Sequence, residues 1–125
     1  MMGSMVGALA ETLALAQAAG VDGAQVMEML DASAMANPIC KAKGKMMLQR
    51  EGGGGGGGGG AWPPGENFQL YLQQKDLRLA LCLADACGVP APITAAVNAQ
   101  YVAARARGLE QADFAAVRAT YEPAR

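Results

Sequence analysis

Apolar residues recur along most of the chain at intervals of three and four, the spacing that places side chains on one face of an α-helix. In residues 1–19 this face consists of Met2, Met5, Val6, Leu9, Leu13 and Ala16. The face beside it carries the small residues Gly3, Gly7, Ala10 and Ala14. Small side chains let another backbone approach closely. We therefore predict a buried first helix that ends at Gly20, a residue type that commonly terminates helices.

The middle of the chain alternates between short helical segments and breaks. Asp22 is a candidate N-cap of a second helix, with Gln25 at capping-box spacing, and Asn37-Pro38 ends this helix. A third short helix is expected over residues 41–48. Gly52 to Gly60 then form an uninterrupted glycine tract. Glycine builds no core and loses the most backbone entropy on ordering, so residues 49–67 are predicted to be a flexible, disordered surface loop.

The longest predicted helix covers residues 69–86. One face consists of Leu70, Gln73, Leu77, Ala80, Leu81 and Ala84. Leu72, Leu79 and Leu83 widen this face, which predicts a central and mostly buried helix. Gly88 ends it, and Pro92 lies in the first turn of the next helix. The inner stripe of that helix is predicted to be Ile93, Ala96, Val97, Gln100 and Ala104.

A last helix is predicted to begin near Gln111 and to carry Phe114 and Val117 inward. Alanine, leucine and methionine are abundant and favour helices, whereas β-branched residues are scarce. The predicted fold class is all-α, with five to six helices in one domain over residues 1–125.

Composition excludes several classes of function. The formal net charge is −1, which provides no attractive field for nucleic acid or anionic lipid, and we expect neither as a partner. Three cysteines do not suggest a disulfide framework, so we expect them to pack in the core in a reducing compartment. The chain has no histidine, which excludes a histidine base or a histidine metal site. We expect no metal site.

Two polar groups are candidates for a functional role. The first is the run Gln73-Gln74-Lys75-Asp76, where an opposite-charge pair follows apolar positions on a helix and requires a partner in the fold or in a ligand. Periodicity alone favours a different interpretation, a solvated surface ion pair. The second group is Asn37, Lys41, Lys43 and Lys45, interpreted as a solvated basic loop. Tyr101 and Arg105 have the spacing of a structural pair on one helix face.

The order of the motifs adds information. The chain reads Met-Gly-Ser-Met at 2–5, Ala-Met-Ala-Asn-Pro at 34–38, Asn-Phe at 67–68 and Gln-Gln-Lys-Asp-Leu-Arg-Leu-Ala-Leu at 73–81. Gly-Val-Pro at 88–90 and Asp-Phe-Ala-Ala-Val at 113–117 follow. In this order the sequence resembles the C-terminal helical domain of the β-hydroxyacid dehydrogenases, which include 3-hydroxyisobutyrate dehydrogenase. Within that family it is most similar to the plant-type glyoxylate/succinic semialdehyde reductases.

This resemblance implies a 6-phosphogluconate dehydrogenase-like C-terminal domain in an oxidoreductase that uses NADP or NAD. Such an enzyme reduces small aldehydes such as glyoxylate and succinic semialdehyde, or oxidises 3-hydroxy acids. Lys75 matches the family lysine that reaches the nicotinamide cofactor, and Phe68 and Asp76 match residues that line the active-site cleft. The implied partners are an N-terminal Rossmann domain and further copies in a homo-oligomer, packed in part through the Gly3 and Gly7 face. The implied location is the cytoplasm, a plastid or a mitochondrion.

The sequence also departs from the family pattern. The Rossmann fingerprint is not found in these residues, and the family's catalytic lysine would fall just upstream of Met1, so we name no catalytic residue and expect the 125 residues alone to be inactive. A glycine tract replaces a short proline-containing loop, and Lys45 replaces a usual proline. Two alternatives remain open: a stand-alone helical oligomerisation module without catalysis, and an incompletely predicted copy of a full-length enzyme.

Overall fold

The computed structural model describes residues 1–51, 62 and 68–122, where every named element is a helix and Gln69 forms an isolated antiparallel bridge with Asp113. The elements are α1 (Met2–Ala18), α2 (Gly23–Asp31), α3 (Pro38–Glu51), α4 (Leu70–Ala86), α5 (Pro92–Ala106) and the 3₁₀ helix η1 (Phe114–Tyr121). The predicted all-α class is confirmed. The predicted loop over residues 49–67 lies mostly outside the described residues, although residues 49–51 still belong to α3.

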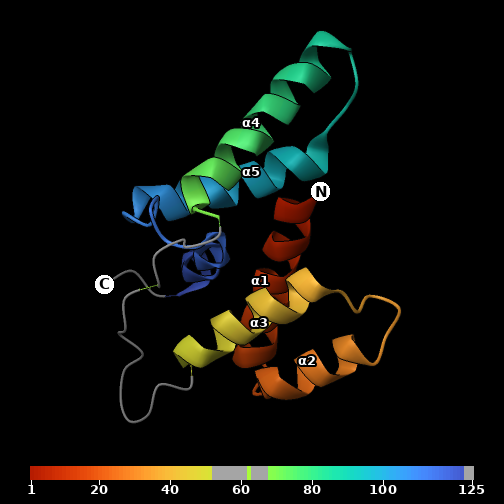
Figure 1. Ribbon diagram of the computed structural model, residues 1–125, viewed down its shortest axis with the longest axis vertical. Coiled ribbons are helices and arrows are strands. Elements are labelled where there is room, and N and C mark those ends of the chain that lie inside the picture. The colour runs from red at the N-terminus through yellow and green to blue at the C-terminus, as the bar shows by residue number, and fades with distance from the viewer. Residues whose placement is uncertain (52–61, 63–67, 123–125) are drawn as a thin grey trace.

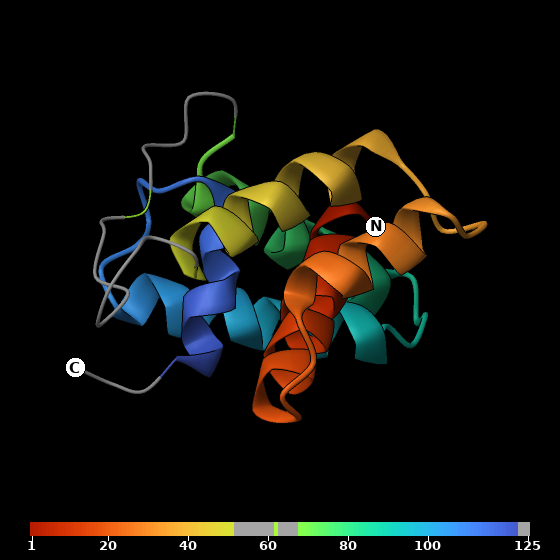
Figure 2. The ribbon, with the colours of Figure 1, turned by 90° about the horizontal axis from the view of Figure 1, so that it is seen from below.

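The helices form two groups joined by α1. Figure 1 shows α4 and α5 packed as a hairpin in the upper half and α2 with α3 in the lower half, with α1 running between them. Figure 2 shows η1 between α3 and α5. Because η1 also packs on α1, the last helix of the chain lies at the meeting point of both groups.

Short glycine and aspartate signals set the helix ends as predicted. Gly20 has a positive φ of 74°, and the amide of Val21 donates to the carbonyl oxygen of Ala16 at 2.8 Å, which closes α1 with a Schellman motif. Gly88 and Gly108 end α4 and α5 with positive φ as well. Asp22 caps α2 through a bond from the amide of Ala24. Asn37 does more than end a helix, because its side chain accepts from the amide of Cys40 and starts α3 three residues before the predicted position.

The core is built mainly from α1, α5 and η1. Val6, Leu9 and Leu13 of α1 are buried as predicted, and Phe114 and Val117 of η1 point inward as predicted. Gly3 and Gly7 are buried against Gln73, Val97 and Gln100. The close approach expected of these glycines is therefore made within the chain, to α4 and α5. The expectation that Gly3 and Gly7 pack against another copy of the chain is wrong.

Three expectations about burial are corrected. The second half of α4 is exposed, with Leu79 at 55% and Leu83 at 65%, so this helix is not mostly buried. The inner stripe of α5 is Val97, Tyr101 and Ala104, whereas Ile93 is 71% exposed. Cys82 and Cys87 are exposed rather than packed in the core. For the two helices the apolar pattern identified residues that share a face, but it does not say whether that face meets this chain or something else. For the cysteines their number alone does not determine burial.

Candidate functional site

The N-terminal end of α4 is held by the segment that precedes η1. The amide of Leu70 donates to the carbonyl oxygen of Ala112 at 2.8 Å, and the amide of Tyr71 donates to the carbonyl oxygen of Glu110 at 3.1 Å. These bonds satisfy two of the amides that a helix leaves unpaired in its first turn. The residues before α4 thus run antiparallel to residues 110–114, which fixes where the helix begins.

Phe68 lies beside this junction and is half-buried. Its carbonyl oxygen accepts a bond from the amide of Phe114 at 3.1 Å, and its ring packs edge-on against the Phe114 ring with centroids 5.8 Å apart. Edge-to-face packing is a favoured arrangement of aromatic rings. Both the backbone and the ring of Phe68 are therefore positioned by one residue of η1.

Two glutamines orient α4 around its own axis. Gln74 is buried, donates to Asn98 Oδ1 at 2.9 Å and accepts from Arg105 Nη1 at 2.7 Å, which ties α4 to α5. Gln73 is also buried and packs against Gly3 of α1. Arg105 thus pairs with Gln74 across the hairpin, not with Tyr101 as its spacing suggested. Because both glutamines face inward, the two residues that follow them face outward.

Lys75 and Asp76 form an ion pair on this outward face. Lys75 Nζ lies 3.1 Å from Asp76 Oδ1, and the two side chains are 47% and 48% exposed. Within the described residues this is the geometry of a surface pair, the interpretation that periodicity alone favoured. The pair lies five and six residues into α4, about 7–9 Å along the axis from its start near Phe68. Lys75 and Asp76 therefore lie in the first half of α4, and Phe68 lies two residues before this helix begins.

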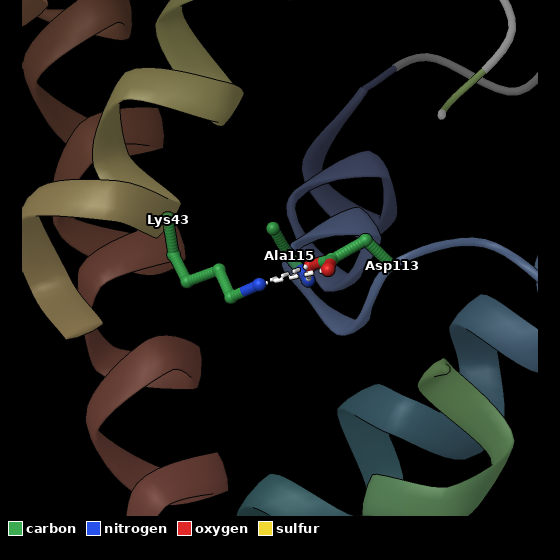
Figure 3. A network of polar contacts seen from close by, with 3 residues as sticks. All are labelled: Lys43, Asp113 and Ala115. Carbon is green, nitrogen blue, oxygen red and sulfur yellow. Dashed lines mark hydrogen bonds and ion pairs between the residues drawn. The ribbon is translucent and has the colours of Figure 1, made fainter. Parts of the chain in front are cut away.

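The sequence reasoning missed a second Lys–Asp pair, which is buried. Lys43 was assigned to a solvated basic loop, yet its Nζ donates to both carboxylate oxygens of Asp113, at 2.9 and 2.7 Å, and the side chains are only 10% and 2% exposed. Figure 3 shows Lys43 reaching from α3 to this carboxylate. Lys41 and Lys45 are exposed as expected, and Lys41 pairs with Asp31 at 3.1 Å. The one sequence signal was Asp113 itself, an N-cap residue type before an alanine-rich helix.

The buried carboxylate also affects Tyr101. Burial raises the pKa of the Tyr101 phenol above its ordinary value, and the charge of Asp113 raises it further. The hydroxyl of Tyr101 makes no hydrogen bond among the described residues. This side chain is therefore a neutral phenol held next to a charge, with no geometry for exchanging a proton with solvent.

The described residues contain neither a metal-ligand cluster nor a membrane-spanning helix. No three cysteine, aspartate or glutamate side chains gather there as metal ligands. No helix in that part of the chain is long and apolar enough to cross a bilayer.

Comparison with known proteins places this geometry in a family. Residues 1–121 match the family model described as the NAD-binding domain of NADP-dependent 3-hydroxyisobutyrate dehydrogenase. The chain is 40% identical over 116 residues to glyoxylate/succinic semialdehyde reductase 1 of Arabidopsis thaliana, covering 93% of this chain and 36% of that protein. It is 36% identical over 115 residues to the cytokine-like nuclear factor N-PAC of Aedes aegypti, covering 92% of this chain and 18% of that protein.

The fold is also found in a solved structure. The crystal structure of 3-hydroxyisobutyrate dehydrogenase from Salmonella typhimurium superposes with a TM-score of 0.79 at 20% identity, over 94% of this chain and 37% of that one. The chain therefore spans about a third of the reductase and the dehydrogenase that it resembles, the part that normally accompanies an N-terminal Rossmann domain. On the match of its first 121 residues, this chain belongs to the 3-hydroxyisobutyrate dehydrogenase family, as its C-terminal NAD-binding domain.

Proposed function

We propose that this chain is the cleft-closing domain of a reductase that acts on small aldehydes, with glyoxylate and succinic semialdehyde as the first substrates to test and NADPH or NADH as the reductant. Run in reverse, the same site oxidises a 3-hydroxy acid. The observation that carries the proposal is the outward face of α4, where Lys75 and Asp76 stand exposed two turns from Phe68 in a chain of this family.

The surroundings of the pair support a covered rather than a solvated face. Leu79 follows Lys75 by one turn, Leu83 follows Leu79 by another, and both are more than half exposed. Contiguous exposed apolar side chains commonly mark a surface that meets another domain or chain. We infer that the dinucleotide-binding domain covers this stripe, so that Lys75 and Asp76 face the cleft between the two domains.

The residues present fit a dinucleotide at the edge of its site. Lys75 offers an ammonium with three donors, suited to ribose or phosphate oxygens, and its present bond to Asp76 is an exposed one that contributes little free energy. Exchanging that partner for a cofactor oxygen therefore costs little. In this proposal Asp76 holds a substrate hydroxyl or a neighbouring side chain, and Phe68 excludes water from the reacting carbon. The bound nicotinamide supplies the hydride.

A second candidate comes from the relatives. One protein of similar sequence is named a nuclear factor, not a reductase. In a non-catalytic oligomerisation module the exposed leucines of α4 would meet other copies, and the charges beside them would have no ligand. The two functions differ in what they require of Lys75, because only the reductase needs its ammonium at a cofactor.

The direct experiment joins this chain to the dinucleotide-binding domain of the Arabidopsis reductase and follows NADPH oxidation with glyoxylate. We expect turnover in the fusion, and we expect Lys75→Ala to raise the KM for NADPH more than it changes the preference among aldehydes. Arg78→Ala is the matched control, because Arg78 is an exposed cation three residues further along the same helix. This variant should leave the KM for NADPH and the preference among aldehydes unchanged. Equal NADPH kinetics in the Lys75→Ala and Arg78→Ala fusions would refute the role of Lys75.

A simpler measurement uses the 125-residue chain by itself. We expect no oxidation of NADPH with glyoxylate, because Lys75, Asp76 and Phe68 supply only one wall of the proposed site. Turnover by the purified chain, at a rate that Lys75→Ala abolishes, would contradict the division of the site between two domains.

A further inference from the structure

The buried pair between Lys43 and Asp113 does more than join two helices. Asp113 Oδ1 accepts from Lys43 Nζ and also from the amide of Ala115 at 2.9 Å, so the same carboxylate binds α3 and caps η1 (Figure 3). Lys43 Nζ also lies 4.5 Å from the centroid of the Phe114 ring. One ammonium therefore holds both residues, Asp113 and Phe114, that lead into η1.

Those two residues in turn hold Phe68. Asp113 is the bridge partner of Gln69, and Phe114 supplies both the backbone bond and the ring contact that fix Phe68. A line of contacts therefore runs from Lys43 through Asp113 and Phe114 to Phe68, with each member at least partly buried.

We propose that Lys43 and Asp113 are positioning residues that set the place of Phe68, the aromatic wall of the proposed aldehyde site. The part concerning the aldehyde rests on the proposed function; the part concerning the position of Phe68 does not. An ion pair serves this purpose better than an apolar contact because it is directional, and a bidentate carboxylate fixes the backbone that carries it.

The test uses the chain itself and its two phenylalanines, Phe68 and Phe114. Incorporation of 4-fluorophenylalanine gives two fluorine resonances, and Phe68→Leu assigns them. The deciding variant is Lys43→Met with Asp113→Asn, which removes both buried charges while asparagine retains the N-cap. We expect this double variant to fold and its Phe68 resonance to move or broaden, because Asp113 and Phe114 link Lys43 to Phe68.

Two controls separate positioning from general stability. Lys41→Met removes an exposed, ion-paired lysine from the same helix and should leave both resonances in place. Lys43→Arg keeps the charge and should retain a Phe68 resonance close to the original. A native Phe68 resonance in the double variant would overturn the proposal, and so would a double variant that cannot fold, because the pair would then serve folding alone.

The link to the aldehyde has its own readout. In the fused reductase we expect the double variant to raise the KM for glyoxylate several-fold and to leave the KM for NADPH unchanged. An unchanged KM for glyoxylate, with a displaced Phe68 resonance in the isolated chain, would reject the role of Phe68 in the site. Because the fluorine measurement needs no cofactor, failure of the reductase assignment would leave its result intact.

Discussion

Two lysine–aspartate pairs in this small domain have similar geometry and opposite surroundings. Lys43 and Asp113 meet at 2.7 Å with almost no exposed surface, whereas Lys75 and Asp76 meet at 3.1 Å with about half of each side chain exposed. A buried pair cannot lose one partner without leaving an uncompensated charge, whereas an exposed pair can exchange its partner at little cost. Lys43 and Asp113 therefore serve to hold the fold together, whereas Lys75 and Asp76 remain available to a ligand.

The largest effect should come from breaking the buried pair. Asp113→Ala leaves the Lys43 ammonium buried and unpaired and removes the cap of η1, so we expect a loss of about 3–5 kcal/mol in the free energy of unfolding. Denaturant titration measures this loss. Asp31→Ala, which breaks the exposed pair with Lys41, should cost less than about 1 kcal/mol. Equal losses in the two variants would contradict the distinction between buried and exposed pairs.

An intermediate effect should appear at alkaline pH near the buried pair. Burial, and to a smaller extent the charge of Asp113, raises the pKa of Tyr101 in the folded state. The neutral phenol therefore contributes its full share to the stability of the fold below the ordinary tyrosine pKa of 10.0, and this contribution is lost as the pH rises above that value. Each pH unit above that value should cost about 1.4 kcal/mol. Tyr101→Phe should remove this part of the decline while leaving stability at neutral pH similar or higher, since the hydroxyl lacks a hydrogen bond among the described residues.

The smallest effect on stability is expected at the exposed pair. Lys75→Ala and Asp76→Ala should each change the free energy of unfolding by less than about 1 kcal/mol, and a double-mutant cycle should give a coupling in the same range. The same Lys75→Ala change should nevertheless be the one that alters NADPH kinetics in the fused reductase. A large stability loss at Lys75 would assign this pair to the architecture as well.

Helices and their ends could be predicted from sequence because their causes are local. Gly20, Asp22 and Pro92 each act within a few residues, and the structure confirms the helix end, the cap and the first-turn proline that they predicted. The face of α1 was predicted for the same reason. Periodicity reports which residues share a face, and this part of the information is contained in any short window of sequence.

What the sequence did not reveal depends on distant residues or on other chains. Lys43 finds its partner 70 residues away, and nothing near Lys43 distinguishes it from its exposed neighbours Lys41 and Lys45. The exposed leucines of α4 carry the pattern of a core helix, because periodicity shows which residues share a face and not what covers that face. The roles of Phe68, Lys75 and Asp76 remain predictions, since the family resemblance supplied them and the geometry of one domain does not test them.

The support of Phe68 from η1 has a consequence for how the sequence can change. Phe68 follows a run of nine glycines along the chain, yet the backbone bond and the ring contact that hold it come from Phe114, which lies after α4 and α5 in the sequence. The entropy of closing a chain segment varies only slowly with the length of the segment. We therefore expect a change in the length of this run to leave the aromatic side chain that follows it in its place.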